Sequence, residues 1–256
     1  MPIPTLMVVR CIPSITTHSR GGHGWREKIP ELPELGVTEC ALFVTGLTSS
    51  QREECYTLLL QAKQLLPFTI PFVHAVSSMR EDEFWFLHDT FGTEAFNLHP
   101  QWDFPLVHSL STRIRERIFI ENCSVSTPLT REDLVGFAGL CLDLSHLEDA
   151  RRNHPENFAR TVALTRTTKV GANHISGVRN LGVRPDGSLG GTSTHIAETS
   201  EDFSYLATIP ARCFSAVLAL ELENPIKEQL ELIDDVKRRS LLALERPAPP
   251  ERPPTR

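Results

Sequence analysis

Residues 139–152, GLCLDLSHLEDARR, begin as an apolar strand and then change character abruptly. Gly139 to Leu142 suit a protein core, Asp143 follows at once, and His146 comes three residues later. A buried carboxylate is costly unless it is paired or bound to a metal ion. The stretch therefore predicts a strand whose carboxyl end reaches a polar site.

Eight short apolar runs of this kind recur along the chain, each followed by a longer stretch of helical character. They are TLMVVRC (5–11), ECALFVTGL (39–47), TIPFVHAV (69–76), EAFNLH (94–99), RIFIEN (117–122), GLCLDL (139–144), VGANHI (170–175) and SAVLALELE (215–223). Such an alternation predicts an α/β fold, a single parallel (β/α)₈ TIM barrel over residues 1–245, with a doubly wound open sheet as the alternative. Residues 246–256, RPAPPERPPTR, predict a disordered Pro-rich tail.

Composition narrows the function class. The net charge of -6 provides no general attraction for a polyanion, so a nucleic acid is a possible but not a favoured partner. No apolar run approaches the roughly 18 residues of a membrane-spanning helix, and the N-terminal residues do not resemble a signal peptide. We therefore expect a cytoplasmic protein with no membrane partner. The six cysteines lack CxxC spacing and predict buried, reduced thiols.

Polar residues gather where the predicted strands end, and in a parallel barrel these ends converge on one site. The residues are His74, His99, Glu121, Asp143, His146, His174, His195, Glu221 and Glu223. Any one of them alone is weak evidence, because a single histidine near a strand end is usually structural. Their recurrence predicts a site for one to three divalent ions such as Zn²⁺, Mn²⁺, Fe²⁺ or Co²⁺, which accept imidazole and carboxylate ligands.

The ligands can be shared among ions in more than one way. Glu121 would bridge two ions, with Asp143, His174 and a last-strand glutamate completing one of them. His74 and His99 would then serve a second ion, and His146 and His195 a third. Glu221 and Glu223 have the same strand parity, so the sequence leaves open which of them is the ligand.

The Gly-rich segment 178–194, VRNLGVRPDGSLGGTST, lies between the last two predicted strands. Arg179 and Arg184 would bind an anionic part of a substrate if this segment were a phosphate cradle. The alternative, a surface loop with no ligand, is the more common outcome for such a composition.

The motifs FIEN (119–122), LDLSH (142–146), NHISG (173–177) and LELEN (220–224) resemble those of the xylose isomerase-like TIM-barrel superfamily. This superfamily contains sugar isomerases and epimerases together with nucleases of the endonuclease IV type. For the isomerases and epimerases, the resemblance implies one metal ion held by Glu121, Asp143, His174 and either Glu221 or Glu223.

For the endonuclease IV type, the resemblance implies three zinc ions and adds further ligands. His74, the His99-Pro100 pair and the DLSH motif from Asp143 to His146 match that pattern. At the D-x-H motif, His195 is retained but Ser193 replaces the acid, which puts the third ion in doubt because serine is a poor zinc ligand.

The favoured function is isomerisation or epimerisation of a small sugar or sugar phosphate. Glu121 and Glu221 or Glu223 would be the catalytic acid and base that move a proton between carbons. The alternatives are a multinuclear-zinc phosphoester hydrolase resembling endonuclease IV, and a catalytically degenerate barrel that only binds a ligand. The sequence leaves the oligomeric state open.

Overall fold

The structure is a computed structural model that describes residues 9–17, 24–179 and 193–245. Nine strands in this part of the chain form one sheet, in the order β1-β11-β8-β7-β6-β5-β4-β3-β2, and every pairing in it is parallel. The strands are β1 (Arg10–Ile12), β2 (Ser14–Ile15), β3 (Glu39–Phe43), β4 (Thr69–His74), β5 (Ala95–Leu98), β6 (Ile118–Glu121), β7 (Gly139–Asp143), β8 (Val170–Ile175) and β11 (Val217–Leu220).

The first barrel strand is split in two by Pro13, which has no N–H to donate to a sheet. Its first half, β1, pairs with β11, and its second half, β2, pairs with β3. The two halves therefore connect the ends of the sheet, which makes eight strand positions around a barrel. The (β/α)₈ barrel predicted from the sequence is confirmed, and the open-sheet alternative is wrong because the first and last strands are neighbours.

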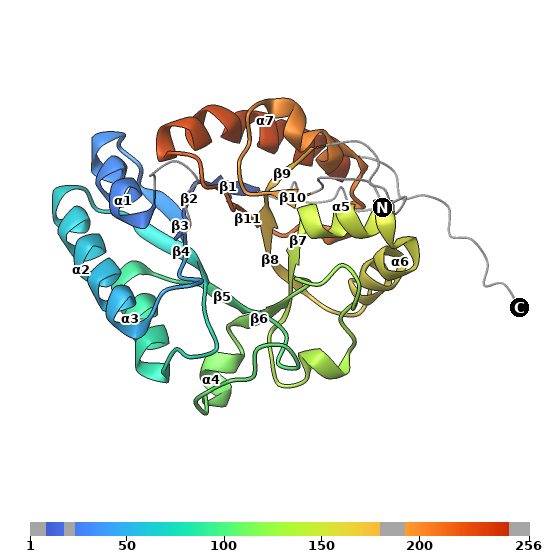
Figure 1. Ribbon diagram of the computed structural model, residues 1–256, viewed down its shortest axis with the longest axis horizontal. Helices are drawn as coiled ribbons and strands as arrows, with labels where there is room; N and C mark the ends of the chain where they lie inside the picture. The colour runs from blue at the N-terminus through green and yellow to red at the C-terminus, as the bar shows by residue number, and fades with distance from the viewer. Residues whose placement is uncertain (1–8, 18–23, 180–192, 246–256) are drawn as a thin grey trace, which may run out of the picture.

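Helices surround the strands, as Figure 1 shows. They are α1 (Trp25–Glu34), α2 (Ser49–Leu65), α3 (Glu81–Phe91), α4 (Thr112–Arg115), α5 (Leu144–Asn153), α6 (Pro155–Leu164) and α7 (Ile226–Leu244). Three 3₁₀ segments are η1 (Glu132–Leu134), η2 (Ser200–Thr208) and η3 (Ala211–Cys213), and a small antiparallel pair joins β9 (Gly177–Val178) to β10 (Ser193–Thr194). No helix in the described ranges is long and apolar enough to cross a membrane.

Alternation along each strand divides the apolar side chains between two cores. One residue of a pair, such as Ile118 or Leu140, packs outward against the helices, and the next points into the barrel. The interior cluster consists of Ile12, Ala41, Phe43, Phe72, Ala95, Phe119, Cys141, Ala172, Val217 and Ala219. The barrel is therefore filled with apolar side chains below its mouth, and the next inward positions toward the carboxyl ends are the ones free to carry chemistry.

Two of the segments predicted from the sequence extend outside the described residues. The first predicted strand, 5–11, begins outside the described residues, and the strand itself continues past Cys11 to Ile15. The predicted disordered tail, 246–256, also lies outside the described residues. All six cysteines are free, and all but Cys123 are buried, as the sequence predicted.

Candidate metal centre

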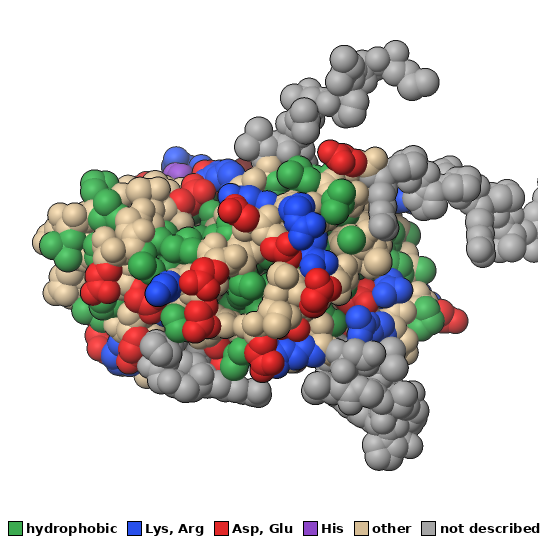
Figure 2. All heavy atoms as spheres, turned by 90° about the horizontal axis from the view of Figure 1, so that it is seen from above, with side chains coloured by type: hydrophobic (Ala, Val, Ile, Leu, Met, Phe, Trp, Pro, Cys, Tyr) green, Lys and Arg blue, Asp and Glu red, His purple; other side chains and the backbone are tan. Residues whose placement is uncertain are grey.

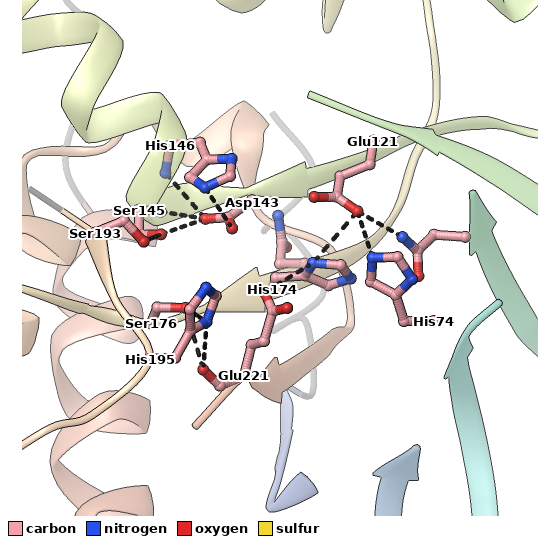
Figure 3. A network of polar contacts seen from close by, with 12 residues as sticks. His74, Glu121, Asp143, Ser145, His146, His174, Ser176, Ser193, His195 and Glu221 are labelled. Atoms are coloured by element: carbon pink, nitrogen blue, oxygen red, sulfur yellow. Dashed lines mark hydrogen bonds and ion pairs between the residues drawn. The ribbon is translucent and has the colours of Figure 1, made fainter. Parts of the chain in front are cut away.

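The inward positions at the strand ends bring five ionisable side chains to one place, the barrel mouth. His74, Glu121 and Asp143 are the last residues of β4, β6 and β7. His174 lies opposite Asp143 in the pairing of β7 with β8, and Glu221 follows directly after β11. Figure 3 shows these side chains pointing toward one another from β4, β6, β7 and β8 and from the end of β11.

Glu121 is the centre of this cluster. Its Oε2 accepts a hydrogen bond of 2.7 Å from the Asn97 amide and lies 2.9 Å from Nε2 of His74. It also lies 3.6 Å from Nε2 of His99 and 3.8 Å from Nδ1 of His174. Burial alone would raise the pKa of Glu121, but the imidazoles of His174, His74 and His99 together hold it well below the usual value. Glu121 is therefore an ionised carboxylate in the barrel interior.

The orientation of His74 places its Nε2 against that carboxylate. Nδ1 of His74 lies 3.1 Å from the Ala75 carbonyl, which can only accept, so Nδ1 carries the proton. In the neutral ring, Nε2 is then unprotonated and faces an oxygen of Glu121 that is also an acceptor. A proton or a metal ion must lie between these two atoms, and the backbone contact of Nδ1 is the orienting bond that metal-bound histidines usually make.

Asp143 explains why its strand stops where it does. Its Oδ1 caps α5, accepting hydrogen bonds from the Ser145 and His146 backbone N–H groups at 2.7 and 3.0 Å and from the Ser145 hydroxyl at 2.6 Å. Its Oδ2 is buried and has no hydrogen-bond partner among the described residues. The nearest ionisable nitrogen to Oδ2 is Nε2 of His146, at 3.7 Å. One oxygen of Asp143 therefore terminates the strand and starts a helix, and the other remains available as a ligand.

His174 is completely buried, yet neither of its ring nitrogens has a hydrogen-bond partner among the described residues. Nδ1 lies 3.4 Å from Oε2 of Glu221. Burial raises the pKa of Glu221, but His174 and His195 outweigh this effect and lower it to about 2. Buried polar atoms without partners are rare in proteins. Together with Oδ2 of Asp143, these atoms form a donor set that a divalent cation would satisfy.

Three overlapping groups in the described part of the chain can each hold a metal ion. They are His74–Glu121–His174, Glu121–Asp143–His146 and Asp143–His174–Glu221, with the ligand atoms in each group within 4.8 Å of one another. Since Glu121, Asp143 and His174 are each shared by two groups, the ligands form one continuous arc across the barrel mouth. The mixture of imidazole and carboxylate donors fits Zn²⁺, Mn²⁺ and related divalent ions.

Three predicted ligands lie outside these groups. His99 is partly exposed and packs its ring against Phe104, with 4.8 Å between the centroids. His195 is exposed, and its Nδ1 lies 3.4 Å from the Ser176 hydroxyl and 3.3 Å from the Glu221 carbonyl. The Glu223 backbone N–H donates to the His195 carbonyl. The structure therefore brings Glu221, rather than Glu223, to the cluster.

The two predicted anion-binding arginines have different outcomes. The Arg179 guanidinium pairs with Glu198 at 2.6 Å and with Asp202 at 3.4 Å. Its charge is thus already neutralised, so we do not propose it as a ligand of a substrate anion. Arg184 lies outside the described residues.

Several polar residues of the centre were missed in the sequence. Asn97 lies two residues after Ala95 and two before His99, so all three side chains face the same side of the strand. This spacing could have identified Asn97 from the sequence. Asn122 accepts from the Asp143 N–H at 2.7 Å and donates to the Asp143 carbonyl at 3.1 Å, holding the end of β7 as a neighbouring strand would. Ser193, which the sequence pointed to only as a residue replacing an acid, has its hydroxyl 2.8 Å from that of Ser145 and so continues the Asp143 network.

No protein-family model matches the sequence, and no curated protein matches it. Among solved structures, the chain is similar to a Mycobacterium smegmatis protein described as a xylose isomerase-like TIM barrel protein in complex with magnesium. The match covers 91% of this chain and 97% of that one, with 14% sequence identity and a TM-score of 0.48. The barrel itself is established by the strand pairing described above.

Proposed function

We propose that this protein is a divalent-metal-dependent isomerase or epimerase that acts on a small sugar or sugar phosphate. The observation that supports the proposal most directly is the placement of two carboxylates around one imidazole, that of buried Glu121 and that of partly buried Glu221. Oε2 of Glu121 and Oε2 of Glu221 both lie within 4 Å of Nδ1 of His174. Two carboxylates at one site, with further ligands between them, are what a proton shift between adjacent carbons requires.

Each carboxylate has a distinct part in such a reaction. Glu221 would take a proton from one substrate carbon and return it to the adjacent carbon. Glu121, held by the Asn97 amide and by His74, would carry the accompanying proton between the substrate oxygens. A bound divalent ion supplies polarisation of the carbonyl and hydroxyl oxygens of the substrate, which makes the carbon-bound proton more acidic. Asp143 and His146 would supply further ligands at the far end of the arc.

A small cavity beside the centre supports a small-molecule substrate. It has a volume of about 130 Å³ and is lined by Thr45, Gly46, Ala75, Val76, Ser77, His99 and Phe104. It has room for several water-sized groups, enough for the end of a short polyol. Hydroxyl groups and an aromatic ring line it, which suits a carbohydrate chain. On the face shown in Figure 2, acidic and basic side chains are mixed, so that face offers no continuous basic path for a nucleic acid.

A second candidate, phosphoester hydrolysis, is favoured by one specific observation. His74 forms with Glu121 and His174 a further group that could hold an ion, which a single-ion isomerase does not need. His99 lies close to the same Glu121 carboxylate. A pair of ions supplies an activated water and stabilises the leaving oxygen of a phosphoester. The number of bound ions therefore separates the two candidates.

The test combines metal content with two activity assays on purified protein. We expect deuterium from heavy water to enter one carbon of an aldose, a ketose or one of their phosphates, detected by NMR, in the presence of Mn²⁺ or Co²⁺. Glu221→Gln should abolish this exchange. Glu53→Gln, which removes the same charge from the exposed surface of α2, should leave it unchanged.

Other results would contradict the proposal. Two or more bound zinc ions, with cleavage of a simple phosphodiester or an abasic-site oligonucleotide and no proton exchange, would establish the hydrolase instead. Protein that takes up no divalent metal and catalyses neither reaction would be a barrel that only binds a ligand.

A further inference from the structure

The barrel mouth contains a seam that backbone pairing does not close. Because β1 carries the pairing with β11, β2 has a strand partner on one side only in the described sheet, namely β3. We call the residues that fill the other side the seam: Ser14, Thr16, Lys28, Leu222 and Gln229. All five are buried.

Gln229 of α7 replaces a strand at this seam. Its Oε1 accepts from the Ser14 N–H at 2.7 Å, and its Nε2 donates to the Ser14 carbonyl at 3.0 Å. The amide also donates to the Asn224 carbonyl at 2.8 Å. One side chain thus makes the two hydrogen bonds that a peptide group of a paired strand would make.

Lys28 of α1 completes the seam at the level of the metal centre. Its side chain is fully buried, and its Nζ donates to the Thr16 hydroxyl and to the Leu222 carbonyl, both at 2.7 Å. The Thr16 hydroxyl donates to the same Leu222 carbonyl at 2.9 Å. Burial lowers the pKa of Lys28 to about 7, against the opposing effects of Glu31 and Glu223. Burying a lysine costs free energy because its charged form loses hydration. The residue whose carbonyl it binds is therefore of interest.

That carbonyl belongs to the residue that follows Glu221. On its other side, the Glu221 N–H donates to the Ile175 carbonyl at 2.8 Å, and the Glu221 carbonyl accepts from Ser176 at 3.2 Å. The backbone on both sides of the Glu221 side chain is therefore hydrogen-bonded. Its N–H is bound by β8, and the carbonyl of the next residue is bound by Lys28 of α1.

We propose that Lys28 is a positioning residue for the metal centre, which fixes through the Leu222 carbonyl the backbone that directs Glu221 toward His174. The inference rests on the proposed metal site, but it does not depend on which reaction that site catalyses. Residues that orient metal ligands from outside typically change metal affinity 10–100-fold when they are replaced.

The test uses Co²⁺, whose visible absorption reports the geometry of its ligands. Lys28→Met keeps most of the length of the side chain and removes its donors, and Thr16→Val removes one donor with little change of shape. We expect both variants to bind Co²⁺ about 10-fold or more weakly than the wild type. Their spectra should shift toward that of Glu221→Gln.

Lys63→Met is the matched control. Lys63 of α2 donates to the Phe68 carbonyl at 2.8 Å, so the substitution removes the same kind of bond at a place outside the three ligand groups. It should lower the unfolding temperature but leave Co²⁺ affinity and spectrum unchanged. If Lys28→Met does not fold, Thr16→Val alone decides.

The outcomes separate this inference from the proposed function. Wild-type protein that binds Co²⁺, with Lys28→Met and Thr16→Val binding it identically, would overturn only the positioning role. An equal loss of affinity in Lys63→Met would overturn it as well, since the effect would then be general destabilisation. Wild-type protein that binds no Co²⁺ would overturn the metal site and this inference together.

Discussion

Replacing Gly171 by alanine should test how tightly the barrel interior holds Glu121. Gly171 is the extra residue where the pairing of β7 with β8 shifts register. A Cβ there would lie 2.1 Å from the ring of Phe119, whereas ordinary contact begins at 3.4 Å. The ring must therefore move by more than an ångström in a packed interior, which costs about 1–3 kcal/mol. For a domain of this size, that lowers the unfolding temperature by roughly 2–12 °C.

Displacing Phe119 should also disturb Glu121, because the two residues lie on the same face of β6 two residues apart. We expect Gly171→Ala to weaken metal binding together with stability, measured by thermal melts and by competition with a chromogenic chelator. Adding Phe119→Leu should relieve the clash. The double variant should therefore lose less unfolding free energy than the two single variants lose together, by about 1 kcal/mol or more. Strict additivity, or an unfolding temperature unchanged by Gly171→Ala, would refute the argument.

Two further predictions concern single ionisable groups. Burial lowers the pKa of Lys28 from 10.5 to about 7, so between these values the unfolded chain holds a proton that the folded chain has lost. The stability of the wild type relative to Lys28→Met should therefore rise with pH across that window, by about 1.4 kcal/mol per pH unit, and should be flat below it. Urea titrations at several pH values measure this difference in unfolding free energy. A difference that does not change with pH would contradict the lowered pKa of Lys28. Asp143→Asn should keep the cap of α5 but lose the ligand charge, so metal content falls while the melting temperature of metal-free protein stays close to the wild type. Asp143→Ala should lose both, and retention of full metal content by Asp143→Asn would exclude Asp143 as a ligand.

The strand-end residues could be predicted because two simple regularities coincide in a parallel barrel. Side chains alternate along each strand, and all strands end on the same side. Glu121, Asp143 and His174 each follow an apolar inward residue at a spacing of two, so their direction follows from the strand itself. The same rule would have found Asn97, had amides been considered together with ionisable groups.

The same rule fails where the strand ends. Glu221 and Glu223 share parity, but only Glu221 still hydrogen-bonds to β8, through the Ile175 carbonyl. At Glu223 the backbone N–H has turned to His195, which comes from a different segment. The alternation of side chains predicts their direction only while the strand remains paired in the sheet. The residue at which the pairing stops depends on partners that are distant in sequence.

Arg179 illustrates a second limit of the sequence. A Gly-rich neighbourhood and a free cation favour anion binding, but Glu198 and Asp202 follow the long segment and return to pair with Arg179. Nothing in the local pattern indicates that return. Long-range pairing of charges is set by the path of the chain, which composition does not encode.

The use of Gln229 as a substitute strand has a consequence for how the chain is made. Ser14 is among the first residues of the barrel and Gln229 lies in α7, the last helix described. As the chain leaves the ribosome, β2 is therefore an open sheet edge until α7 docks, and open edges pair with other chains. A chain that stops before α7 should self-associate through β2, and the interval between synthesis of β2 and of α7 is when this protein is most exposed to aggregation.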